Sequence, residues 1–144
     1  MADRLTVVDS AGRAKAFRPL PASARAAALH EGLDAYDRGD FFEAHELLEP
    51  AWMGTDDPGE RAFLQGLIKL AAAYVHDVRG NPAGIVKNLT GARAWLVEGS
   101  LAEPRRAGLD LAVLVADIDD RLADLAAHPA GPTLGPPVLH RSEP

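Results

Sequence analysis

The 144-residue sequence contains no cysteine. This absence excludes thiolate catalysis, cysteine-ligated zinc and a disulfide scaffold, so a metal site would have to use His, Asp or Glu side chains. The sequence also lacks a run of about 18 uncharged apolar residues, which a membrane-spanning helix needs. The first twenty residues contain no apolar run of signal-peptide length. We therefore expect a cytoplasmic, bacterial-type protein with no membrane partner.

Positive charge is scarce as well. Lys and Arg number 15 against 21 Asp and Glu, which gives a formal net charge of -6, and the arginines are scattered along the chain. A nucleic-acid interface needs a clustered basic face, so we expect no nucleic-acid partner. The apolar content of 47% is enough for one ordinary domain to bury a core without disulfides.

The apolar residues recur at helical spacing along most of the chain, and no segment shows the alternation of a strand. Three regions are predicted: an irregular N-terminal arm over residues 1–20, a single helical domain over 21–127, and a Pro- and Gly-rich tail over 128–144 that is flexible or bound to the surface. The predicted fold class is all-α. The architecture is a compact bundle of about five helices with a tight N-terminal helical hairpin.

Start and stop signals bound these helices. Gly39 is expected to end the first helix, and Asp40 with Glu43 reads as a capping box that begins the second almost at once. Asp57 is expected to cap the third helix, which Gly80 ends. Within the second helix, Pro50 predicts a kink or an early end because it lacks a backbone N–H.

The candidate site combines polar residues of the second and third helices. His45 and Glu49 are four residues apart at the edge of an apolar face, whereas Glu43 and Glu46 point further outward. The third helix carries a row of four polar residues at helical spacing: Arg61, Gln65, Lys69 and His76. Antiparallel packing of the two helices would bring these two sets together as one cluster.

This cluster allows a structural and a functional interpretation. The structural one, which is the default, is a buried network in which Glu49 pairs with Arg61. The functional one is a catalytic or divalent-metal site of His45, Glu49 and His76, since imidazole and carboxylate suit zinc, manganese or iron. The segment around His45 is not the HExxH zinc motif, because Glu49 stands where the second histidine would be.

The chain contains, in this order, Gly39–Glu49 with Trp52, then Arg61–Ile68, His76 and Arg79–Asn81. In these residues it resembles the prokaryotic "domain of unknown function 309" family. The resemblance runs from the first helix into the fourth. It implies a compact all-helical domain, and it supplies no reaction.

Three classes of function are therefore open. In the first, the cluster binds a small ligand or acts as a metal-dependent or acid/base hydrolase-like enzyme, with Arg61 holding an anionic group, Gln65 orienting it, and Glu46 and Trp52 as further candidate contacts. In the second, the chain is a helical module that binds a protein. In the third, a strip of small residues, Ala62, Gly66 and Ala73, mediates a homodimer.

Overall fold

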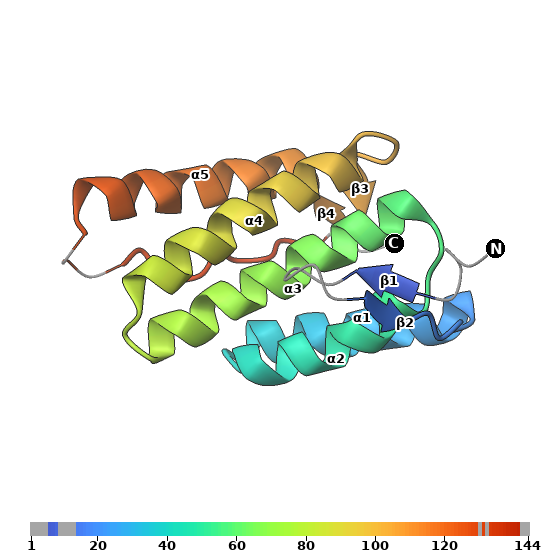
Figure 1. Cartoon of the computed structure of the whole chain (residues 1–144). Coiled ribbons are helices and arrows are strands. Elements are labelled where there is room, and N and C mark those ends of the chain that lie inside the picture. The colour runs from blue at the N-terminus through green and yellow to red at the C-terminus, as the bar shows by residue number, and fades with distance from the viewer. Residues whose placement is uncertain (1–5, 9–13, 130, 132, 142–144) are drawn as a thin grey trace.

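The computed structural model describes residues 6–8, 14–129, 131 and 133–141 of the chain. These residues form five α-helices: α1 (Ala22–Asp37), α2 (Phe41–Met53), α3 (Pro58–Val78), α4 (Pro82–Ser100) and α5 (Leu111–Ala127) (Figure 1). The all-α prediction is confirmed. None of the described helices is both long and apolar enough to cross a membrane.

Four short strands accompany the helices, although no strand was expected. β1 (Thr6–Val8) pairs with β2 (Ala14–Ala16), and β3 (Arg105–Arg106) pairs with β4 (Leu109–Asp110), both antiparallel. The first pair lies in the region predicted as an irregular arm. The second fills the break between α4 and α5. Strands of two or three residues are too short to show an alternating pattern in the sequence.

The helices α1 and α3 end in the same way. Gly39 has a φ of +79°, its N–H bonds to the Tyr36 carbonyl, and the N–H of Asp40 bonds to the Ala35 carbonyl at 2.9 Å. Gly80 and Asn81 repeat this arrangement at the end of α3. This is the Schellman motif, in which glycine takes the left-handed conformation that closes a helix. Both predicted stops are confirmed.

The helix starts agree with the sequence in one case and not in the other. The Asp57 carboxylate accepts the Glu60 N–H at 2.8 Å and caps α3 as predicted. Asp40 precedes α2 but makes no side-chain cap hydrogen bond, so the predicted capping box is wrong. Instead, a hydrogen bond between the Asp40 and Glu43 side chains raises the pKa of Glu43. The helix α2 also continues through Pro50 to Met53, so it does not end early.

Small residues bring α3 and α4 into close contact. The strip of Ala62, Gly66 and Ala73 is buried inside the chain. A Cβ atom added at Gly66 would lie 2.7 Å from Leu96 Cγ, and one added at Gly99 would lie 2.9 Å from the Phe63 nitrogen. The strip therefore serves helix packing within one chain and is not exposed to a second copy. Homo-oligomerisation through another surface stays a prediction.

The described part of the tail, residues 133–141, packs along the bundle beside α5 and α3 (Figure 1). Pro137 is fully buried, and Leu139 is only 8% exposed. Of the two behaviours expected for the tail, these residues show the surface-bound one. The three-region division of the chain otherwise stays a prediction.

Candidate functional site

One aromatic contact and a loop hydrogen bond show how α2 lies against α3, and a second aromatic contact joins α2 to α1. At one end, the ring of Phe41 lies 5.3 Å from Tyr36 and 5.7 Å from Tyr74. At the other end, Arg61 Nη2 donates to the Thr55 carbonyl at 2.8 Å. The two helices are therefore antiparallel, which is the condition under which the two polar sets were expected to meet (Figure 1). We call the set of His45, Glu49, Arg61, Gln65, Lys69 and His76 the polar stripe.

On α2, the imidazole of His45 is one-third exposed, but its Nδ1 atom is buried and has no hydrogen-bond partner. Glu46 Oε1 lies 3.4 Å from this atom, but the geometry is not that of a hydrogen bond. Glu46 is 58% exposed, in agreement with its predicted outward direction. Glu49 is half-buried and has a polar partner of its own.

On α3, one nitrogen of the Arg61 guanidinium is hydrogen-bonded and another has no hydrogen-bond partner. Its Nη2 bonds to the carbonyl of Thr55, a residue that is 3% exposed, while its Nε atom is buried without a partner. Within the described residues, no ion pair joins Arg61 to Glu49, so the predicted pairing of these two side chains is not present. One turn further along the helix, Gln65 is buried, with 4% exposure.

His76 lies apart from these residues, at the turn between α3 and α4. Its Nδ1 is 3.1 Å from Asn81 Nδ2, and its ring lies against Gly84, where an added Cβ would approach Cγ to 2.5 Å. Fifteen residues separate Arg61 from His76, which is about 22 Å along a helix axis. The stripe is thus extended, not a compact cluster.

The described residues contain no group of three or more His, Asp or Glu side chains that could hold a metal ion. The structure therefore gives no support to a metal site made of His45, Glu49 and His76. Trp52, a predicted ligand contact, is 2% exposed and belongs to the core, and Trp95 is 40% exposed on α4. The stripe's remaining feature is its pair of buried, unpaired polar atoms, on His45 and Arg61.

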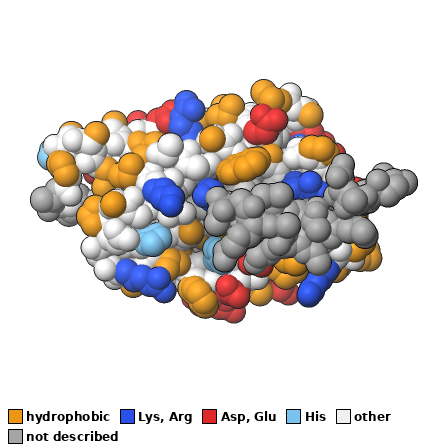
Figure 2. Space-filling model, viewed as in Figure 1, with side chains coloured by type: hydrophobic (Ala, Val, Ile, Leu, Met, Phe, Trp, Pro, Cys, Tyr) orange, Lys and Arg blue, Asp and Glu red, His pale blue; other side chains and the backbone are white. Residues whose placement is uncertain are grey.

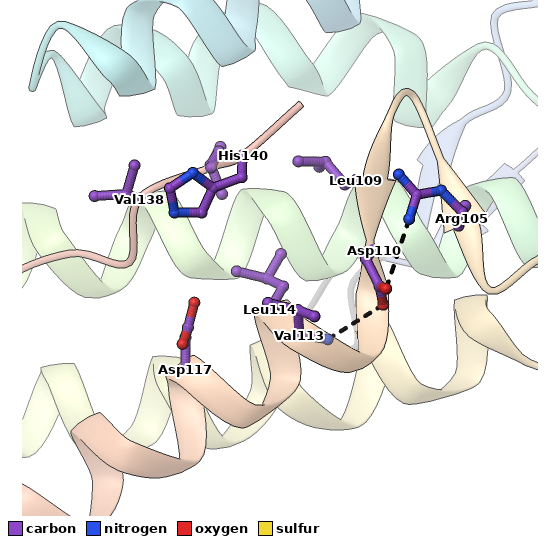
Figure 3. Close-up of a pocket in the computed structure, with 9 residues that line it drawn as sticks. Arg105, Leu109, Asp110, Val113, Leu114, Asp117, Val138 and His140 are labelled. Carbon is purple, nitrogen blue, oxygen red and sulfur yellow. Dashed lines mark hydrogen bonds and ion pairs between the residues drawn. The ribbon is translucent and has the colours of Figure 1, made fainter. Parts of the chain in front are cut away.

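The structure has a concave region, away from the polar stripe, that was not predicted from the sequence. Cavities of about 220, 870 and 430 Å³ adjoin the β3–β4 hairpin, and Arg105 contributes to all three. In the first cavity, Arg105 Nη1 lies 3.6 Å from Asp110 Oδ2. His140 of the tail and Asp117 of α5 face the opening of this cavity (Figure 3). The largest has an apolar lining from Leu29, Leu33 and Leu139. No residue of the polar stripe lines these cavities.

The face drawn in Figure 2 shows Lys and Arg side chains dispersed among acidic and apolar ones. The expectation of no nucleic-acid partner stays a prediction.

No curated protein matches the chain. Residues 29–88 match a family model described as "Domain of unknown function (DUF309)". The matched range runs from α1 into α4 and contains every residue of the polar stripe. The resemblance to the DUF309 family that the sequence predicts is therefore confirmed over residues 29–88.

Proposed function

We propose that this chain is a binding domain for a small anionic ligand, a carboxylate or a phosphate, with Arg61 as its anchor. The observation that carries this proposal is the buried Arg61 Nε atom, which has no hydrogen-bond partner. A guanidinium nitrogen can only donate, and a buried donor without an acceptor costs about 1–3 kcal/mol. A ligand oxygen at this atom would remove that cost.

The surroundings of Arg61 suit such a ligand. The bond from Nη2 to the Thr55 carbonyl holds the guanidinium in place before a ligand arrives, which reduces the entropy lost on binding. Planar guanidinium groups recognise carboxylate and phosphate oxygens with geometric specificity. Gln65 lies one turn away on the same helix, and its amide can orient the bound group.

His45 is the second group of the site, because its Nδ1 is the other buried atom without a partner. On α2, Glu49 lies one turn closer than His45 to the loop between α2 and α3, where the Thr55 carbonyl accepts from Arg61. An anionic ligand at Arg61 with a polar extension along α2 would reach these residues in order. The acid/base and metal alternatives need His45, Glu49 and His76 in one place, and the position of His76 at the α3–α4 turn disfavours both.

Side-chain NMR tests the proposal directly, since the Arg61 Nε–H gives its own signal. With inorganic phosphate and succinate as probes, we expect a saturable shift of this signal at concentrations up to about 10 mM. Arg61→Lys keeps the charge but removes the Nε donor, so it should weaken binding at least about tenfold. Arg79→Lys, an exposed arginine following the same helix, is the matched control and should bind as the wild type does.

Two results would count against the proposal. One is the absence of any saturable shift with both probes. The other is an equal loss of affinity in Arg61→Lys and Arg79→Lys, which would mean that only net charge matters. Metal analysis of tag-free protein, with His45→Ala and His76→Ala for comparison, separately tests the metal alternative.

A further inference from the structure

The tail segment, residues 133–141, has no regular secondary structure and contacts side chains of α1, α3 and α5. Its side chains alternate: Pro137 and Leu139 are buried and Arg141 is half-buried, whereas Val138 is 65% exposed and His140 is exposed. This two-residue period is how an extended peptide presents every second side chain to a binding surface.

The bundle holds the backbone of the tail segment with side-chain donors. Tyr36 of α1 donates from Oη to the Pro137 carbonyl at 2.8 Å. The Gly135 carbonyl accepts two bonds, from Tyr74 Oη of α3 at 3.2 Å and from Arg121 Nε of α5 at 3.0 Å. Gly135 has a φ of +83°, which other residues rarely adopt, and this turn accompanies a carbonyl that two donors share.

Two side chains of the segment supply sequence selectivity. Leu139 is buried among the apolar residues of the core and also lines two of the cavities. Arg141 Nη2 lies 3.1 Å from Asp34 Oδ1 and 2.7 Å from Asp37 Oδ2, so α1 presents two carboxylates to one guanidinium. Asp34 and Asp37 precede Arg141 by more than 100 residues in the sequence.

From these contacts we propose that the surface under the tail is a peptide-recognition site for extended segments of the pattern Pro-x-Leu-x-Arg, which the chain's own tail occupies as an internal ligand. Most of these contacts come from α1 and α3, which are far from the tail in the sequence, so they do not require a covalent link. A separate partner peptide of this chemistry would displace the tail and open the cavities that Leu139 lines. This surface is distinct from the polar stripe, so it does not depend on the anion site.

The covalent link favours the internal tail, because a short connection gives an effective concentration of about a millimolar or more. The test therefore weakens the tail within the full-length chain. The probe is a fluorescently labelled peptide with the sequence of residues 133–141, followed by anisotropy. We expect the Leu139→Ala/Arg141→Ala chain to bind it at least about tenfold more tightly than the wild-type chain does, because the weakened tail competes less.

Matched peptides test the alternation. Replacing the inward residues, Leu139 and Arg141, by Ala in the peptide should lose at least about tenfold in affinity. Replacing the outward residues, Val138 and His140, by Ala should leave the affinity within about twofold of the parent peptide. If the double-variant chain does not fold, Arg141→Ala alone replaces it, with an expected gain of about two- to fivefold.

The proposal is overturned if a folded weak-tail chain binds the peptide no better than the wild type does. It is also overturned if the inward and outward peptide substitutions cost the same. A wild-type dimer that free peptide dissociates, seen by light scattering, would show that a second copy's tail is the occupant and would overturn the assignment to a separate partner.

Discussion

Gly66 of α3 lies so close to Leu96 of α4 that a Cβ atom at position 66 would stand 2.7 Å from Leu96 Cγ. Atoms that are not bonded to each other do not approach a Cβ so closely, and the Leu96 backbone nitrogen lies 3.1 Å from the same point. Adding one methyl group here must push two packed helices apart. We expect Gly66→Ala to lower the free energy of unfolding by about 1–3 kcal/mol in urea denaturation, despite the better helix propensity of alanine.

Gly91→Ala is the matched control for this substitution. Gly91, like Gly66, lies inside a helix, in this case α4. The atoms that an added Cβ would meet there belong to the Lys69 side chain. A long side chain can shift more readily than packed backbone, and alanine gains up to about 1 kcal/mol in helix propensity. Gly91→Ala should therefore be neutral or stabilising. Similar losses for the two variants would show that the close approach at Gly66 is not what limits stability.

The ends of the helices could be predicted where the signal is local. The glycines at positions 39 and 80 and the Asp57 cap act on backbone groups within a few residues, so the sequence alone contains the information. The capping box at Asp40 is not formed: Asp40 makes no side-chain cap hydrogen bond, and the Glu43 carboxylate lies 3.7 Å from Arg38 Nη2. A sequence motif does not show which of several nearby donors a carboxylate accepts from.

Other features depend on contacts that the sequence does not contain. The β3–β4 hairpin turns at Ala107 and Gly108, both with positive φ, but the usual signal for such a turn is Asn-Gly or Asp-Gly. The tail is fixed by partners distant in sequence, such as Tyr36. The separation of His76 from Arg61 is different in kind, because it follows from their fifteen-residue spacing along one helix, which the sequence alone contains.

The contrast between the two N-caps gives a second prediction. Asp57→Ala removes the acceptor of the Glu60 N–H and should cost about 1 kcal/mol of stability. Asp40→Ala removes no cap hydrogen bond, so it should change stability by less than about 0.5 kcal/mol. It should also lower the pKa of Glu43, measured by NMR titration, because the hydrogen bond and charge that raise this pKa are gone. A larger stability loss in Asp40→Ala would contradict this assignment.

The two tyrosines predict an alkaline loss of stability. Burial raises the pKa of Tyr74 from 10.0 to about 12 and that of Tyr36 further. The unfolded chain releases the two phenolic protons near pH 10. The folded chain retains them because burial disfavours the charged phenolate, and both hydroxyl groups donate to the tail. The stabilisation is therefore complete below about pH 10 and is lost as the pH rises toward and through the folded pKa values.

Urea denaturation between about pH 8 and pH 11 checks this expectation. Because lysine titrates in the same range, the useful quantity is the difference between the wild type and the Tyr36→Phe/Tyr74→Phe chain, which contains no tyrosine. The difference in stability should shrink as the pH rises. A constant difference would mean that the hydroxyl groups do not remain protonated in the fold or do not contribute to it.

The last prediction concerns whether the tail segment contributes to the stability of the whole domain. Leu139 is 8% exposed within the core cluster, and its neighbour Val138 is 65% exposed. Truncating a buried leucine to alanine removes apolar contacts and leaves a cavity, so Leu139→Ala should cost about 2 kcal/mol or more. Val138→Ala removes side-chain atoms that already contact water and should cost less than about 0.5 kcal/mol. If both variants unfold at the wild-type urea concentration, residues 133–141 are not part of the cooperative unit, because their burial then contributes nothing that global unfolding removes.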